Sequence, residues 1–142
     1  MVNKDVVTAK LSELVDRTIR ARQHCPSEVA QLAADRDALD LVAFNLMLAV
    51  QVCADIASHL IADERWPAAR SLAESFDRLV EHGVTTPETS EQLKRAVGLR
   101  NVVAHGYARV NVEMVHRAAT DGVRDLEAFA ADVARFVHSQ PE

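Results

Sequence analysis

The amino-acid sequence predicts an all-helical protein, a bundle of five helices packed up and down against one another. Apolar residues recur every three or four positions over most of the chain, which is typical of helices with one buried face. No segment alternates apolar and polar residues in the way that a half-buried strand requires. The 142 residues contain no linker, repeat or low-complexity stretch, so we expect residues 1–142 to form a single domain.

The first two helices are predicted from apolar repeats and one cap. The first spans about residues 5–31, and Pro26 is expected to kink or break it. The second follows Asp35, whose side chain can accept hydrogen bonds from free N–H groups, and it ends at about residue 62. Within it, residues 41–54 include only two polar side chains. We therefore expect this segment to be the central core helix and part of a subunit interface.

The other three helices are predicted mainly from their ends. Ser71-x-x-Glu74 has the spacing of a capping box and starts the third helix, which ends at Gly83. Pro87 lies in the first turn of the fourth, which spans about residues 86–105. Asn111 caps the fifth helix. The buried face of the fifth is expected to be formed by apolar residues at helical spacing: Val112, Val115, Ala119, Leu126, Ala130, Val133 and Val137.

Charge and composition bear on three questions: whether the protein coats nucleic acid, whether it enters a membrane, and whether it holds a metal. A net charge of −5 excludes a protein that coats nucleic acid in general, although a local positive pocket can still cut RNA. We find no signal-peptide pattern, and we expect no apolar run to reach the ~20 residues that span a bilayer. Cys25 and Cys53 lie far apart, which favours free thiols and a cytoplasmic location. No His or Cys pair has the spacing of metal ligands, so no metal or cofactor is predicted.

The segment that indicates function is 99–107, Leu-Arg-Asn-Val-Val-Ala-His-Gly-Tyr, at the end of the fourth predicted helix. It places Arg100, Asn101, His105 and Tyr107 within eight residues. Such side chains can hold a phosphate, orient a ribose hydroxyl and move a proton near neutral pH. We therefore treat these four residues as the candidate site.

Helix geometry restricts how the candidate residues are used. Arg100 falls in the middle of an apolar stripe, where an unpaired guanidinium group is costly. It must either pair with a carboxylate, with Asp40 and Asp55 as the candidates, or face a polar cleft. Asn101 and His105 are four residues apart and therefore share one face of the helix. The stripe itself consists of Leu93, Ala96, Val97, Val103 and Ala104.

The segment Arg100-x4-His105-x-Tyr107 resembles the signature of the HEPN superfamily, in its HepT-like branch of RNase toxins. Asn101 occupies the neighbouring polar position of the wider HEPN motif. The position of the signature, at the end of the fourth of five helices, makes the resemblance fairly specific. Further segments are similar to family sequence in family order: Asp35-x4-Asp40, Gln51-x3-Asp55-Ile56-Ala57, Phe76-x2-Leu79 and Gly98-Leu99-Arg100-Asn101.

The resemblance implies the toxin of a type II toxin–antitoxin pair, a metal-independent endoribonuclease. Two protomers of a two-fold homodimer would line a common cleft with both signatures. In that cleft a base takes the proton of a ribose 2′-hydroxyl group, whose oxygen then attacks the adjacent phosphorus. By the resemblance, His105 is the acid–base group and Arg100 stabilises the phosphoryl charge. Asn101 would orient His105 or the scissile phosphate.

The resemblance also implies a partner that acts on Tyr107, the only tyrosine in the chain. In HepT-like toxins a minimal nucleotidyltransferase antitoxin attaches AMP to the tyrosine of the signature. Tyr107 is thus the implied regulatory site, and a larger hetero-oligomer with the antitoxin is the implied complex. Its place after Gly106 favours an exposed ring, and a ring packed on the bundle is the alternative.

Two other interpretations stay open. The chain could be a non-catalytic HEPN module that binds and regulates a nucleotidyltransferase, with Arg100 and His105 retained for structure. It could also be a purely structural helical dimer. Cleavage of RNA by the pure dimer without metal separates the first from the toxin. The structural dimer predicts no growth defect on expression and no nucleotidyltransferase partner.

Overall fold

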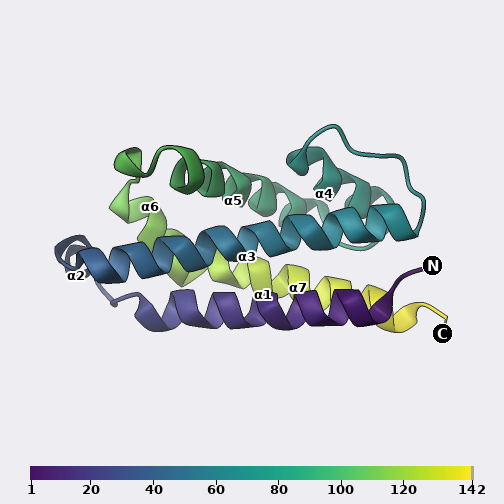
Figure 1. The fold of residues 1–142 in the computed structure, drawn as a ribbon, viewed down its shortest axis with the longest axis horizontal. Helices are drawn as coiled ribbons and strands as arrows, with labels where there is room; N and C mark the ends of the chain where they lie inside the picture. Colours follow the sequence, from purple (N-terminus) through teal and green to yellow (C-terminus); the bar gives the residue numbers. More distant parts are fainter. Residues whose placement is uncertain (142) are drawn as a thin grey trace.

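Four long helices run up and down the length of the molecule (Figure 1). They are α1 (Lys4–His24), α3 (Arg36–Asp63), α5 (Pro87–His105) and α7 (Val123–Ser139). The structure, a computed structural model, describes residues 1–141 without the side chain of Arg109, and within this range no strand occurs. The predicted all-helical bundle is confirmed, and Glu142 of the expected domain lies outside the described residues.

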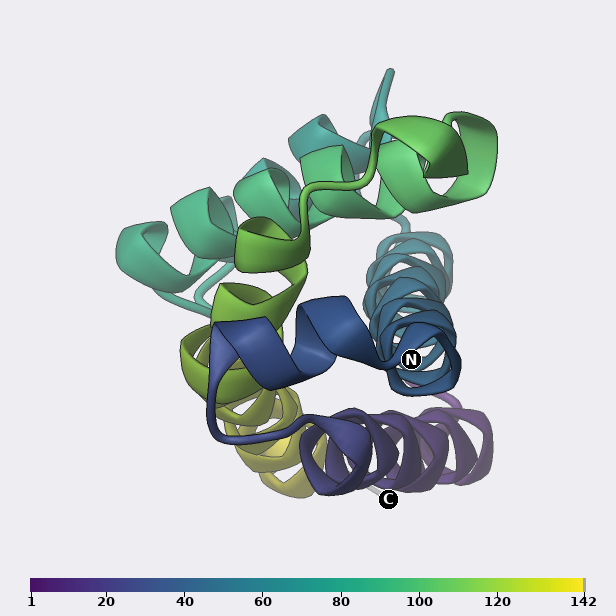
Figure 2. The same ribbon diagram turned by 90° about the vertical axis from the view of Figure 1, so that its left-hand side faces the viewer.

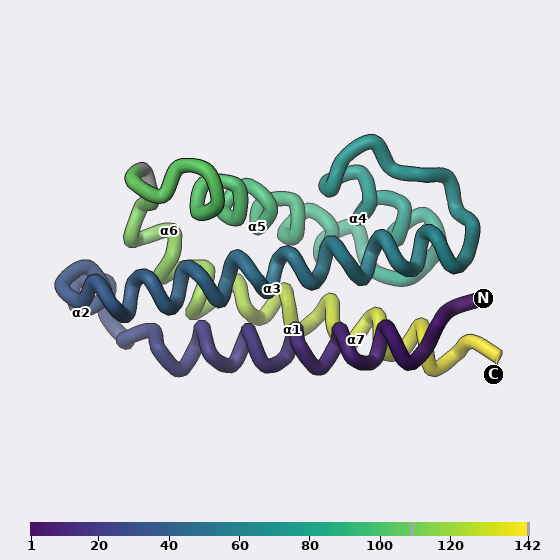
Figure 3. Tube along the Cα trace, viewed as in Figure 1, coloured from purple at the N-terminus to yellow at the C-terminus, as the bar shows by residue number. Residues whose placement is uncertain are grey.

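Short helical segments connect the long ones. Figure 3 shows α2 and α6 at one end of the molecule, whereas the two termini lie together at the other end. Nζ of Lys4 donates a hydrogen bond to the carbonyl oxygen of Gln140 at 2.8 Å and joins the terminal segments. The short segments are α2 (Val29–Ala34), α4 (Leu72–Glu81), a 3₁₀ turn (Tyr107–Arg109), α6 (Val112–Arg117) and a π turn (Ala118–Gly122).

Two predicted helices differ from the structure for identifiable reasons. The first ends at His24 and not near residue 31, because Pro26, which was expected to kink or break it, lacks an N–H group and the preceding Cys25 is extended. The chain then forms α2 as a separate helix. The predicted fifth helix is continuous from α6 to α7 but contains the π turn, which inserts extra backbone into one turn. Counted this way, the described range holds six helices.

The predicted caps are confirmed by hydrogen bonds. Asp35 accepts from the backbone N–H of Ala38 at 3.0 Å, and Asn111 accepts from that of Glu113 at 2.8 Å. The hydroxyl groups of Ser71 and Thr86 each accept a backbone N–H at 3.1 Å. Gly83 has φ +75°, a conformation that favours glycine, where α4 ends. Local chemistry therefore sets where α3 to α6 begin.

Helix α3 lies at the centre of the packing. Figure 2 shows it between α1 and the α4–α5 pair, with α7 beside α1. Its residues belong to both apolar clusters of the core. The helix is long and apolar enough to cross a membrane, so the expectation that no run reaches that length is wrong. Because 61% of the apolar window is buried inside the bundle, this is the pattern of a core helix.

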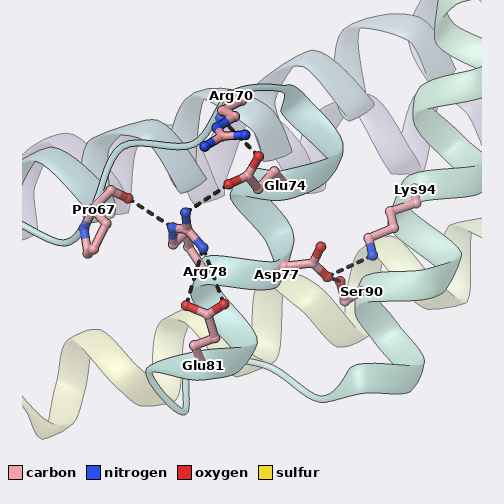
Figure 4. A network of polar contacts seen from close by, with 8 residues as sticks. All are labelled: Pro67, Arg70, Glu74, Asp77, Arg78, Glu81, Ser90 and Lys94. Atoms are coloured by element: carbon pink, nitrogen blue, oxygen red, sulfur yellow. Dashed lines mark hydrogen bonds and ion pairs between the residues drawn. The ribbon is translucent and has the colours of Figure 1, made fainter.

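A network of charged side chains fixes the start of α5 (Figure 4). Nζ of Lys94 lies 2.7 Å from a carboxylate oxygen of Asp77 on α4. Arg78 pairs with Glu74 at 2.8 Å and donates to the carbonyl oxygen of Pro67 at 3.0 Å. These contacts hold α4 against both the preceding loop and α5. The opposite end of α5, which carries the candidate site, takes no part in this network.

Candidate active site

The candidate residues lie where α5 ends and the chain turns toward α6. The N–H group of Gly106 donates to the carbonyl oxygen of Val102 at 2.8 Å and closes the last turn of α5. A 3₁₀ turn beginning at Tyr107 follows, and Asn111 then caps α6. Arg100, Asn101 and His105 are thus on α5, whereas Tyr107 leaves the helix and reaches toward α3.

Arg100 is half-buried and has no carboxylate partner among the described residues. Its Nε atom is buried and makes no hydrogen bond. Of the two alternatives for Arg100, the pair with Asp40 or Asp55 does not form, because both carboxylates have other partners. Asp40 accepts from Tyr107, and Asp55 lies 3.7 Å from Nζ of Lys10. A buried guanidinium nitrogen without a partner is costly, and an anion at this position would remove the cost.

The apolar stripe of α5 explains why Arg100 is only partly buried. Leu93 and Val97 are buried, Val103 is half-buried against the second apolar cluster, and Ala104 is exposed. Burial along the stripe therefore decreases toward the end of α5. Asn101 and His105 are exposed and share one face through their spacing of four residues. In the described part of the chain, no side-chain hydrogen bond joins any two of the four candidate residues.

Tyr107 is tied to the first turns of α3. Its Oη donates a hydrogen bond to Oδ1 of Asp40, and Nε of Arg36 lies 3.5 Å from the same oxygen. The ring is half-buried and packs against the apolar cluster between α1, α3 and α6, so the expectation of an exposed ring is wrong. Burial, followed by the bond to Asp40, raises the pKa of Tyr107 to about 12.

Asp40 and Arg36 are the residues at this site that the sequence did not assign to it. Asp40 was expected near Arg100, and its partner Tyr107 is 67 residues away along the chain. No sequence spacing signals such a contact. The only indication was the Asp35-x4-Asp40 segment, which resembles family sequence.

A groove of about 880 Å³ lies between α3 and α5 beside this contact. Two of its apolar side chains are unusually exposed, Phe44 at 50% and Leu41 at 42%. A second groove, of about 620 Å³, lies on the other side of α5 against α7. Neither groove is lined by Arg100, Asn101 or His105. The first groove is lined by Asp37, Asp40, Leu41, Phe44, Met47, Val103, Ala104 and Tyr107.

Among the described residues, no three His, Cys, Asp or Glu side chains are grouped so that they could hold a metal ion. The polar chemistry available at the end of α5 is therefore that of a guanidinium group, an amide, an imidazole and a phenol.

The helical fold, with Arg-Asn and His at the end of its penultimate long helix, defines a HEPN-type protein. Residues 13–133 match the family described as "Ribonuclease HepT-like". The chain therefore belongs to the HepT-like ribonuclease family.

Individual relatives agree with this membership. The mRNA nuclease HepT of Shewanella oneidensis is 29% identical over 125 residues, which cover 88% of this chain and 93% of that protein. A protein of Archaeoglobus fulgidus is 30% identical over 112 residues, 76% of each chain. The structure of a tri-AMPylated Shewanella oneidensis HEPN toxin in complex with MNT antitoxin superimposes with a TM-score of 0.85 at 27% identity. That match covers 92% of this chain and 98% of the toxin.

The first prediction concerns the titration of Tyr107. As the only tyrosine, it can be followed alone by the ultraviolet absorbance of tyrosinate. We expect a midpoint at about 12 in the native protein. In Asp40→Asn the midpoint should fall toward the ordinary value of about 10 and stay above it, because ring burial remains.

The sign of the effect on stability follows from the raised pKa. The folded state favours the neutral phenol, so this environment stabilises the fold fully below the unfolded pKa of about 10. The contribution is lost as the pH rises through about 12. A native midpoint near 10, unchanged in Asp40→Asn, would contradict the Tyr107–Asp40 contact.

Proposed function

We propose that this protein is a metal-independent endoribonuclease, the toxin of a type II toxin–antitoxin pair, acting as one domain in the cytoplasm. The observation that carries the proposal is the unpaired, half-buried Arg100 beside exposed Asn101 and His105 on one helix end. The HepT-like family and its named relative, an mRNA nuclease, support the same reaction. The proposed reaction uses the 2′-hydroxyl group of a ribose as the nucleophile. DNA lacks this group, so the substrate class is RNA.

The roles follow from the chemistry of each side chain. A base removes the 2′-hydroxyl proton, the oxygen attacks the adjacent phosphorus, and the leaving 5′-oxygen takes up a proton. We assign the proton transfers to His105, because histidine is the side chain that enzymes use most often as a general acid or base. Arg100 binds the phosphoryl oxygens, where extra negative charge develops. Asn101 orients His105 or the phosphate through its amide group.

We propose that the complete site forms between two copies of the chain. Neither groove beside α5 includes the catalytic candidates, so one chain alone leaves them on an open surface. The α3 face that carries Phe44 and Leu41 exposes apolar area next to the end of α5. Pairing two such faces around a two-fold axis would bury this area and bring two signatures together. It would also double the local positive charge in a chain whose net charge is −5.

We further propose that a minimal nucleotidyltransferase antitoxin inactivates the enzyme by attaching AMP to Tyr107. The solved relative that matches this chain is an AMPylated toxin in complex with MNT antitoxin, which supports a similar pairing here. A phosphodiester on Tyr107 would add a negative charge that can pair with Arg100 and compete with RNA. The nucleoside would crowd the same end of α5.

The second prediction tests catalysis. Arg100→Ala and His105→Ala should each lower RNA cleavage by about 10²–10⁴-fold without metal, because a positioned charge or proton carrier is lost. Matched controls are Arg95→Ala on the same helix and His24→Ala at the end of α1, both exposed. Cleavage of a labelled RNA and helical content by circular dichroism are measured together.

The outcomes separate the competing functions. Full activity in His105→Ala would show that the catalytic assignment is wrong. Folded wild-type protein that never cleaves RNA, yet binds a nucleotidyltransferase, would favour the non-catalytic module. Unfolding of both variants would favour a structural role for these residues.

The third prediction tests the dimer. Light scattering at micromolar concentration should give about twice the mass of one chain. Phe44→Glu should shift the protein to the monomer and lower cleavage, because a two-fold interface contains each change twice. Ile19→Glu is the matched control, since Ile19 is also an exposed apolar side chain, at 45%, but lies on α1 and does not line this groove. A monomeric wild type that cleaves RNA would exclude the shared site.

The fourth prediction tests control through Tyr107. Incubation with the cognate nucleotidyltransferase and ATP should add one or more AMP masses to the wild type, and RNA cleavage should fall in parallel. Tyr107→Phe lacks the hydroxyl group and should keep its original mass. Modification that persists in Tyr107→Phe, or that leaves cleavage unchanged, would refute this form of control.

A further inference from the structure

The hydrogen bond between Tyr107 and Asp40 has no part in the cleavage reaction described above. Oη of Tyr107 donates to Oδ1 of Asp40, and Nε of Arg36 lies 3.5 Å from that same oxygen. The carboxylate side chain of Asp40 is 50% exposed, so the contact lies at the surface and within reach of a partner. A phenol whose proton already points at a carboxylate is arranged to lose that proton.

We propose that Asp40 is the proton acceptor in the attachment of AMP to Tyr107, so that the modified protein itself supplies the base. The inference rests on the proposed modification of Tyr107 and adds a catalytic residue to it. Asp40 contacts the reacting oxygen directly and lies outside the Arg-x4-His-x-Tyr signature.

The reaction balances with ATP as the only other reactant. A lone pair of Tyr107 Oη attacks the α-phosphorus of ATP held by the nucleotidyltransferase. The bond between oxygen and phosphorus forms, the bond from the α-phosphorus to its bridging oxygen breaks, and pyrophosphate leaves. The hydroxyl proton passes to the carboxylate of Asp40 and from there to water.

The geometry of the hydroxyl group favours Asp40 over a base from the partner. A phenolic hydroxyl has one proton and can also accept hydrogen bonds through its lone pairs. The proton is committed to Asp40, so the lone pairs remain available for phosphorus. A base on the nucleotidyltransferase would first have to displace Asp40. Protein kinases use an aspartate in the same way, to accept the proton of a substrate hydroxyl.

The surroundings of Tyr107 create the need for a base. Burial and Asp40 raise the pKa of Tyr107 to about 12, so at pH 7 about one molecule in 10⁵ carries the tyrosinate. The charged groups beside this contact are Arg36 and Asp37 on α3. The residues that α5 contributes to the groove, Val103 and Ala104, are apolar. Within the described lining, Asp37 and Asp40 are therefore the candidate bases, and the hydrogen bond selects Asp40.

The test compares two carboxylates of the same groove. Asp40→Asn keeps the size and an acceptor oxygen but cannot take a proton, whereas Asp37→Asn makes the same charge change without touching Tyr107. Each unlabelled variant is mixed with ¹⁵N-labelled wild type, the cognate nucleotidyltransferase and ATP. Intact-mass spectrometry then follows both proteins in one tube, so every comparison is made under the same transferase activity.

We expect Asp40→Asn to be modified about 10²-fold or more slowly than wild type near neutral pH, and Asp37→Asn to stay within a few fold. The ratio of Asp40→Asn to wild type should rise by up to about tenfold per pH unit, because tyrosinate formation replaces the missing base. Asp40→Glu retains a carboxylate and should recover part of the rate. A purely structural role of Asp40 would not produce this pH dependence.

The contrary results are equally specific. Asp40→Asn modified at the wild-type rate, or faster, would overturn the proposal, and a faster rate would show that Asp40 restrains Tyr107. An equal loss in Asp37→Asn would also overturn it, since charge alone would then explain the effect. If wild type is modified and Asp40→Asn keeps pace, only this proposal falls. If wild type is not modified on Tyr107, the proposed control of the toxin falls with it.

Discussion

Burial of α3 is the constraint on which the rest of the structure depends. Its apolar side chains contribute to both clusters of the core, so the other long helices must pack around it. Its first half leaves two large apolar side chains, Phe44 and Leu41, exposed beside the groove between α3 and α5. The same half carries Asp40, which holds Tyr107. The helix whose position is fixed by core packing thus also anchors the chain that follows α5.

The two ends of α5 differ in how their charged side chains are paired. At its start, Lys94 pairs with Asp77 on α4, and Leu93 lies in the core. Toward its end burial decreases, and Arg100 keeps a buried nitrogen without a partner. Such a nitrogen is costly in the free protein, and in the proposed reaction a phosphate would remove that cost. An internal ion pair would have removed the cost and would also have blocked the proposed phosphate site.

Much of the fold could be predicted because its signals are local. Asp35, Ser71, Thr86 and Asn111 act on N–H groups within a few residues, so sequence spacing alone identifies them. The π turn, Ala118–Gly122, was not predicted. It leaves the apolar repeat of the fifth helix almost unchanged, so the sequence pattern does not reveal it.

The candidate site could be predicted only in part. Arg100, Asn101 and His105 follow one another on a single helix, so helical spacing orders them. The apolar stripe indicated that Arg100 needs a carboxylate or a polar cleft, but spacing along one helix could not decide between them, because any partner would come from another helix. Asp40 and Tyr107 meet through the packing of α3 against the end of α5, which no spacing encodes.

The charges around the end of α5 are divided in a way that relates the two proposed reactions. In the two proposed reactions Arg100 and His105 would act on a phosphate, whereas Asp37 and Asp40 line the groove beside Tyr107. Once Tyr107 carried AMP, its oxygen could no longer donate to Asp40, and the new phosphodiester would be repelled by that carboxylate. The cations that could attract it are Arg36, whose Nε lies 3.5 Å from Asp40, and Arg100 on α5. The proposed inhibition requires the phosphodiester to pair with Arg100. The negative charge that would take the proton from Tyr107 would therefore also favour movement of the product away from Asp40 and out of the groove.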